Sequence, residues 1–152
     1  FKGRKGMLYE GGIRVPFIVN QPGMVPIQTL DNLIYFPDMM PTLAALAKGT
    51  KHLPKQINGI NILPLFYGKQ VDTDNRLLYW EFPGKQRAAR KGDWKCVTIH
   101  PNQPLELYNL KEDPEETNNL AKKYPRRVKE FDEEMQRMHI PTPNWPQPGE
   151  QF

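Results

Sequence analysis

Residues 77–109 carry the most regular pattern in the chain and read LLYWEFPGKQRAARKGDWKCVTIHPNQPLELYN. The segment divides into runs of strand length: Leu77–Phe82, Gln86–Arg90, Trp94–Ile99 and Leu105–Asn109. Turn-forming pairs separate these runs: Pro83-Gly84, Gly92-Asp93 and Pro101-Asn102. Short strands joined by short turns pair with their neighbours in sequence. The pattern therefore predicts an antiparallel meander.

A helix is predicted downstream of these strands, beginning near Pro125. Its apolar side chains recur at spacings of three and four residues, at Val128, Phe131, Met135 and Met138. This spacing puts them on one helical face and leaves a charged face in solvent. The tail from Ile140 to Phe152 is rich in Pro and Gln, so we expect it to be extended or disordered.

The first part of the chain predicts two further strands. Val15 to Asn20 is apolar and rich in β-branched residues, and a Gln21-Pro22-Gly23 turn follows it, which is typical of a buried strand. Leu30 to Phe36 is a second candidate strand.

A short helix is expected next, with Asp38 capping its start and Pro41 in its first turn. Gly49 is the expected stop, and the apolar stripe consists of Leu43, Leu46 and Ala47. Residues 50–73 are predicted to form a connection that contains a short buried segment between Ile60 and Phe66.

Composition limits the classes of function. The 152 residues suit one domain, or the tail of a larger domain with a small appended unit, and a mean hydropathy of −0.69 predicts a modest core. No apolar run is long enough to span a membrane. The chain begins with Phe1 rather than Met, so a targeting signal could lie upstream. The net charge of +4 is too small to indicate nucleic acid binding by itself.

Basic residues nevertheless gather in two stretches that could face an anionic ligand. The first stretch contains Lys2, Arg4, Lys5 and Arg14, and the second contains Lys85, Arg87, Arg90, Lys91 and Lys95. Solvated surface lysines are the simpler interpretation.

Nucleophiles are scarce. The chain contains no serine, which excludes every Ser-His-Asp arrangement, and its single cysteine, Cys96, lies in an apolar run that favours a buried structural role. The three histidines lack metal-ligand spacing, although His100, at the end of a predicted strand, could reach a ligand. The Glu115-Glu116 pair is interpreted as stabilising a helix start.

The segment from Lys5 to Pro16, KGMLYEGGIRVP, contains two adjacent glycines flanked by basic residues. Adjacent glycines let the backbone bend sharply or approach another group closely. This geometry suits an anion, but a purely structural bend before a strand is the simpler interpretation of these residues alone.

The same segment resembles a characteristic stretch of the sulfatase family. Later segments resemble that family in the same order, namely Asp38 with Pro41-Thr42-Leu43, Asn58-Gly59 through Leu65, Arg90 to Lys95, Leu105 to Leu110, and Asp113 to Ala121. The resemblance covers nearly the whole chain and identifies it as the C-terminal portion of a sulfatase.

The resemblance implies a fold in the α/β class, with α+β character in this portion. Residues 1–72 would be the end of an alkaline-phosphatase-like catalytic domain, residues 73–139 a small C-terminal subdomain with an antiparallel sheet packed on one helix, and residues 140–152 the tail. Family members are sulfuric ester hydrolases, often periplasmic or secreted, that use a formylglycine nucleophile and calcium. Both would belong to the whole protein and lie outside these residues, and Cys96 lacks the required motif.

One active-site residue carries over from the resemblance. Lys5, the lysine before Gly-x-x-Tyr-Glu-Gly-Gly, would contact a sulfate oxygen, whereas Glu10, Arg14 and the glycines would hold the loop in shape. A substrate-binding wall could include Arg87, Arg90, Trp94 and His100. The expected partners are a sulfated small molecule or sulfated sugar and the rest of the sulfatase chain, and this chain alone is expected to be inactive and to hold no cofactor.

Two alternatives remain open at this point. A phosphodiesterase or phosphonate hydrolase of the same superfamily can share the glycine segment. A stand-alone carbohydrate- or anion-binding module could use the two basic stretches.

Overall fold

The computed structural model describes residues 1–82, 86–100, 102–144, 146 and 151. The chain forms two compact units. Residues 1–15 and 76–152 form the sheet unit, and residues 16–75 form the helical unit. None of the helices among the described residues is long and apolar enough to cross a membrane.

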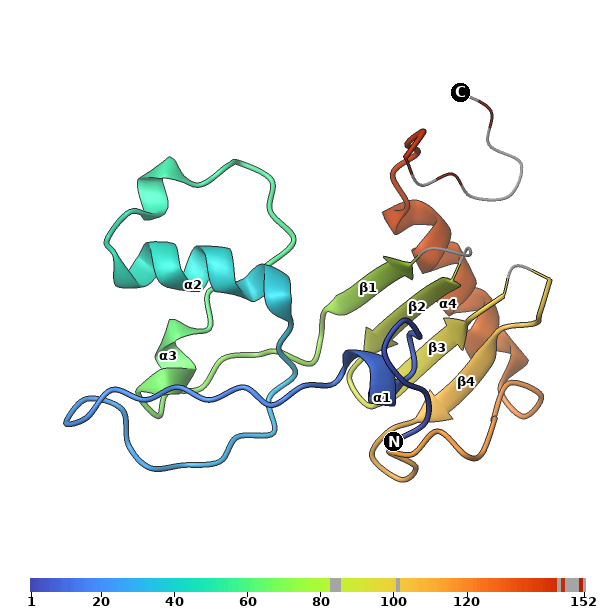
Figure 1. The fold of residues 1–152 in the computed structure, drawn as a ribbon, viewed down its shortest axis with the longest axis horizontal. Coiled ribbons are helices and arrows are strands. Elements are labelled where there is room, and N and C mark those ends of the chain that lie inside the picture. The colour runs from blue at the N-terminus through green and yellow to red at the C-terminus, as the bar shows by residue number, and fades with distance from the viewer. Residues whose placement is uncertain (83–85, 101, 145, 147–150, 152) are drawn as a thin grey trace. The chain divides into compact units, whose positions relative to one another are not determined.

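The sheet unit contains the predicted meander (Figure 1). Its strands are β1 (Leu77–Phe82), β2 (Gln86–Lys91), β3 (Trp94–Thr98) and β4 (Glu106–Asn109). They pair antiparallel in the order β1-β2-β3-β4. The four strands expected from the turn pattern are thus confirmed, with ends shifted by one residue at most. The expected turn at Pro83-Gly84 and the residue Pro101 lie outside the described residues.

Helix α4 (Pro125–Met138) covers one face of the sheet. Phe131 and Met135 are buried in a cluster with Ala89, Cys96 and Leu107, and Val128 packs against it. The predicted helix and its apolar face are therefore confirmed. Cys96 is fully buried, and desolvation raises the pKa of its thiol to about 12, so it is a core side chain rather than a nucleophile.

The N-terminal residues, including α1 (Glu10–Ile13), pack on the opposite face. Leu8 and Tyr9 are buried there against Ala88, Val97 and Tyr108. Because successive side chains of a strand point to opposite faces, Val97 faces this segment while Cys96 faces α4. The sheet is thus covered on both sides.

The helical unit contains short elements: η1 (Phe36–Asp38), α2 (Met39–Leu46), η2 (Thr50–His52) and α3 (Leu63–Phe66). Ile62 and Leu65 are buried, which confirms the expected buried segment, and the Ile62 N–H donates to Thr42 Oγ1 at 3.0 Å. The expected apolar stripe of α2 lies in solvent, since Leu43 and Leu46 are at least half exposed.

Two strand predictions are wrong for the described chain. Val15 to Asn20 is not a strand, and Val15 and Ile18 are 74% and 85% exposed. Leu30 to Phe36 is irregular and ends in η1. An apolar, β-branched run becomes a strand only when another backbone pairs with it, and no other described residues pair with these two segments.

Asp38 is the N-cap residue of α2, as predicted, but its side chain caps the preceding η1 instead. The Asp38 side chain makes no capping bond to α2. Its buried carboxylate instead accepts hydrogen bonds from the backbone N–H groups of Tyr35 and Ile60, both at 2.9 Å. Asp38 thus ties the segment before α2 to the segment after it, and this satisfies two backbone donors within the helical unit.

Candidate functional site

Lys5 lies in a tight turn on the surface of the sheet unit. The Met7 N–H donates to the Arg4 carbonyl at 3.0 Å, which closes a four-residue turn with Lys5 and Gly6 at its centre. Gly6 has φ +89°, as the third position of a type II turn requires, and a side chain there would be strained. The Lys5 side chain is exposed, so its ammonium is free to meet an anion from solvent.

The glycine pair that follows is required by close contacts. A Cβ at Gly12 would lie 1.9 Å from the Met7 carbonyl oxygen, and one at Gly11 would lie 2.5 Å from that of Lys2. The Gly11 N–H donates to the same Lys2 carbonyl at 2.7 Å. The two glycines therefore let α1 fold back onto residues 2–7 and fix the shape of the loop.

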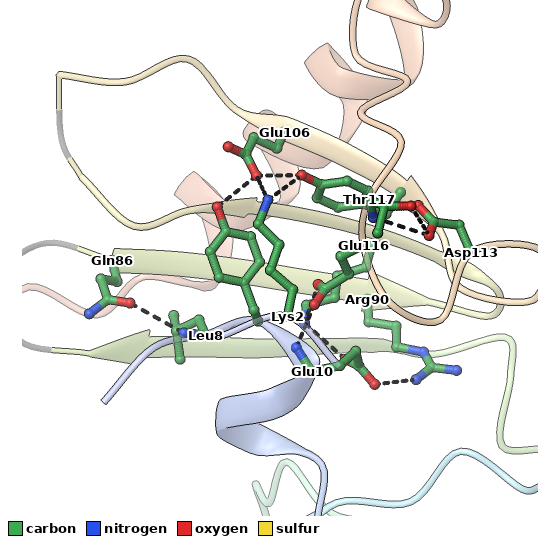
Figure 2. Close-up of polar contacts among 12 residues, drawn as sticks. Lys2, Leu8, Glu10, Gln86, Arg90, Glu106, Asp113, Glu116 and Thr117 are labelled. Carbon is green, nitrogen blue, oxygen red and sulfur yellow. Dashed lines mark hydrogen bonds and ion pairs between the residues drawn. The ribbon is translucent and has the colours of Figure 1, made fainter. Parts of the chain in front are cut away.

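A buried ionic cluster anchors α1 to the sheet (Figure 2). Lys95 Nζ lies 2.8 Å from Glu10 Oε1 and 2.9 Å from Glu116 Oε1, and all three side chains are at most 4% exposed. The Glu10 N–H also donates to Glu116 Oε2 at 2.6 Å. Arg90 adds a second cation, 3.6 Å from Glu10 Oε2. Two carboxylates thus face two cations in the interior.

Glu116 does not stabilise a helix start, which corrects the sequence interpretation. No helix begins near it, and its backbone has φ +56°, an unusual conformation for a non-glycine residue. Burial raises the pKa of its carboxyl group, while the Lys95 charge and the Glu10 N–H oppose that rise. The residue places a buried carboxylate beneath α1.

A second cluster holds the first residues of the chain. Lys2 Nζ donates to the Tyr108 hydroxyl at 2.8 Å and lies 3.2 Å from Glu106 Oε2. It also stands over the Tyr9 ring, 4.1 Å from the centroid. The hydroxyls of Tyr9 and Tyr108 both donate to Glu106, at 2.7 and 2.6 Å. These bonds outweigh desolvation and lower the pKa of Glu106.

The four residues expected to bind substrate do not come together. Arg87 lies 3.4 Å from Asp132 of α4, and Trp94 contacts both the Tyr124 ring and the Arg127 guanidinium. Arg90 pairs with Glu10 on the opposite face of the sheet. His100 is exposed in the segment after β3, where its Nδ1 accepts from the Asn102 N–H at 3.3 Å.

Comparison with known proteins identifies the chain. The family model of the N-sulphoglucosamine sulphohydrolase C-terminal region matches residues 3–140. The chain belongs to the sulfatase family. It corresponds to the C-terminal region of these proteins, as the ordered series of segments from Lys5 to Ala121 indicated.

Individual sulfatases agree with this assignment. A sulfatase of Formosa agariphila is 32% identical over 139 residues, which cover 80% of this chain and 25% of that protein. Arylsulfatase K of Gallus gallus is 30% identical, with coverage of 84% and 26%. A solved Bacteroides thetaiotaomicron protein, described by its part in the metabolism of multiple glycosaminoglycans, superimposes with a TM-score of 0.76 at 29% identity, covering 88% of this chain and 30% of that one. The chain thus spans about a quarter of the curated sulfatases it matches.

The described residues of this sulfatase region do not fit a calcium site. Across residues 1–82, 86–100 and 102–144, no three His, Cys, Asp or Glu side chains gather as metal ligands would. The carboxylates that do meet, Glu10 and Glu116, are neutralised by Lys95 and Arg90. These carboxylates therefore pair with side-chain cations and not with a metal ion.

The sequence did not predict the buried ionic cluster of Glu10, Lys95 and Glu116 beneath the loop. One signal was available: Lys95 alternates with Val97 in a strand, so a charge shares the face of a buried apolar residue and needs an ionic partner. Glu116 gave no such signal, because it lies in an irregular segment where no periodicity defines an inward face.

Proposed function

We propose that this chain is the C-terminal part of a sulfuric ester hydrolase that cleaves sulfate esters. A formylglycine nucleophile and calcium would be supplied by other residues of the whole protein. The observation that carries the proposal is the sulfatase match over residues 3–140, from proteins of which the chain spans about a quarter. Within the chain, Cys96 is buried and serine is absent, so these residues alone should not turn over substrate.

Lys5 is the residue we propose to act on the sulfate group. When the S–O bond breaks, negative charge gathers on the transferring group and on the leaving oxygen. A fixed ammonium beside a sulfate oxygen stabilises that charge most in the transition state, and loss of one such donor costs on the order of 3 kcal/mol. The exposed Lys5 side chain on a closed turn supports this role.

The remaining four predicted residues have different expected contributions to substrate binding. His100 and Arg90 would contact substrate directly, His100 because it is exposed and Arg90 because it lies beside Glu10 and α1. Arg87 and Trp94 would act by holding α4 against the sheet, since both contact that helix or the residue before it. A sulfated sugar is the proposed substrate class, supported by the similarity to a protein of glycosaminoglycan metabolism.

We further propose that the rest of the sulfatase chain covers the helical unit. Apolar side chains of this unit lie in solvent, with Ile27 fully exposed and Ile18 and Phe36 more than four-fifths exposed. Large apolar side chains that lie in solvent can mark a surface that a partner covers. An alkaline-phosphatase-like domain that extends Val15 to Asn20 into a paired strand would bury part of it.

The test begins with the coding sequence upstream of Phe1. A Cys/Ser-x-Pro-x-Arg motif behind a strand with paired aspartates is expected there. The whole protein should then release sulfate from a sulfated monosaccharide, and Lys5→Ala should lower kcat about 100-fold. Lys111→Ala, at an exposed position of the sheet unit, is the matched control and should leave kcat unchanged.

Three results would refute the proposal. One is turnover by the present chain alone, above its own Lys5→Ala variant. Another is a whole protein that prefers phosphodiesters or phosphonates to sulfate esters. The third is saturable binding of sulfated sugar by the isolated chain that Lys5→Ala leaves unchanged, since this would indicate a binding module instead.

A further inference from the structure

Strand β2 presents three side chains to the segment from Gly6 to Glu10. Gln86, Ala88 and Arg90 alternate along the strand and therefore share one face. Ala88 packs in the cluster with Leu8 and Tyr9, and Arg90 pairs with Glu10 at the far end of the segment. Figure 2 shows Gln86 reaching Leu8 at the near end and Arg90 reaching Glu10. One strand thus holds both ends of the segment.

Both polar atoms of the Gln86 side-chain amide form hydrogen bonds with the loop backbone. Its Nε2 donates to the Gly6 carbonyl at 2.8 Å, and its Oε1 accepts from the Leu8 N–H at 3.2 Å. The side chain is 9% exposed, so these bonds are largely shielded from water. The two bonds are made to the peptide groups on either side of Met7. A neighbouring β-strand would make a similar pair of bonds. A carboxylate of the same shape keeps the acceptor and loses the donor.

This contact fixes the residue next to Lys5. Lys5 lies in the turn from Arg4 to Met7. The Gly6 carbonyl, which accepts the hydrogen bond from Gln86, belongs to the last peptide group of that turn. If the bond is lost, Gly6 is free to change conformation, because glycine has little intrinsic preference there. The base of the Lys5 side chain would then move relative to the sheet.

We propose that Gln86 is a positioning residue for Lys5: its amide sets the turn so that the ammonium meets the sulfate group in reactive geometry. The inference rests on the proposed role of Lys5 in sulfate ester hydrolysis. A displacement of about 1 Å of a catalytic group is sufficient to lower a rate roughly 100-fold. Gln86 itself touches neither substrate nor reacting atoms.

The first measurement is amide hydrogen exchange on the present chain. Gln86→Glu should accelerate exchange at Met7, whose bond closes the turn, and should leave exchange at Leu8 unchanged, because the carboxylate still accepts from the Leu8 N–H. Gln103→Glu introduces the same charge at an exposed position between β3 and β4 and should leave both rates unchanged. Unchanged exchange at Met7 in Gln86→Glu overturns the proposal whatever the enzyme does.

The second measurement is a double-mutant cycle in the whole protein. Gln86→Glu should lower kcat about 10- to 100-fold, with KM changed about twofold at most. In the Lys5→Ala background the same substitution should have no further effect on kcat, because its target is gone. An equal loss in both backgrounds overturns the proposal, since it would show a general structural effect.

The two hypotheses fail differently. If Lys5→Ala leaves kcat unchanged, the proposed role of Lys5 is refuted, and the positioning role of Gln86 with it. If Lys5→Ala lowers kcat but the effects of the two substitutions add, only the positioning role is refuted. A Gln86→Asn variant, one methylene shorter, should lose both hydrogen bonds and accelerate exchange at Leu8 as well as at Met7. In the double-mutant cycle it should match Gln86→Glu, which separates loss of the Gly6 bond from added charge.

Discussion

The two units of the molecule differ in where they put charged and apolar groups. The sheet unit buries charge, with Lys95 and Glu116 fully enclosed, and it buries its apolar side chains on both faces of the sheet. The helical unit leaves Ile18, Ile27 and Phe36 in solvent. The difference shows that the sheet unit covers both faces of its sheet with its own residues. In the helical unit, Asp38 and Thr42 satisfy backbone N–H groups, but many apolar side chains stay uncovered.

The most damaging change to the sheet unit should be Lys95→Met. It removes the cation from between Glu10 and Glu116, and breaking a buried ion pair in this way costs about 3–5 kcal/mol. Urea unfolding of the chain should show this loss in the free energy of unfolding. Lys111→Met, at an exposed position, is the control, and a loss for Lys95→Met of no more than about 1 kcal/mol would contradict the buried cluster.

Gly12→Ala should be nearly as damaging. Its Cβ would overlap the Met7 carbonyl oxygen, so α1 must move away from the loop. Forcing atoms into a packed site costs about 1–3 kcal/mol. Thermal unfolding is the measurement, and Gly49→Ala in the helical unit is the matched control, because its Cβ would lie 3.8 Å from the nearest atom. Equal effects of the two substitutions would argue against the tight glycine bend.

Low pH should lower the stability of the sheet unit, because it protonates Glu106. Its folded pKa lies below the unfolded value of about 4.3, because three hydrogen bonds outweigh the effect of burial. The stabilisation is therefore complete above that unfolded value and is lost as the pH falls through the folded pKa. Glu106→Gln should flatten this part of the stability curve and cost roughly 1–2 kcal/mol at neutral pH. The measurement is the urea midpoint of unfolding at each pH from 3 to 7, and Glu112→Gln, at an exposed position, is the control. The prediction would be refuted if the midpoint changed with pH in the same way for Glu106→Gln and for the unaltered chain.

The smallest effect on stability is expected in the helical unit. Replacing Ile18 and Ile27 together by Thr should change the free energy of unfolding by no more than about 0.5 kcal/mol, since both side chains are exposed. The same change should reduce self-association in sedimentation velocity, because it removes exposed apolar surface. A large loss of stability would show that these side chains are buried in solution.

The success of prediction from sequence follows the same division. The four strands and α4 were predictable because alternation, turn pairs and helical spacing are local signals, and their partners lie nearby in sequence. Val15 to Asn20 has an equally strong local signal, yet a strand also needs a pairing backbone, which the pattern cannot reveal. The distinction between a run that can pair and a run that does pair is therefore a tertiary property.

The candidate site was predictable only in part. The glycine segment indicated a loop near Lys5, and the structure agrees that Gly11 and Gly12 shape it. The contacts of Gln86 and Glu116 with that loop join residues 78 and 106 positions apart, and no local pattern reports such contacts. Arg90 gives a further example, since the charged stretch indicated a basic residue near a ligand, while its ion pair with Glu10 could not be predicted from that stretch.

The separation between Glu10 and Glu116 also orders events during synthesis. At roughly 5–20 residues per second, a ribosome needs on the order of 10 s to advance from the loop bearing Lys5 to the carboxylate that receives the Glu10 N–H, 106 positions later. For most of that interval the Lys5 turn has neither Gln86 nor Glu116 to hold it. The loop is therefore made among the first parts of this chain and acquires its native shape among the last, so a chaperone or protease meets it unprotected.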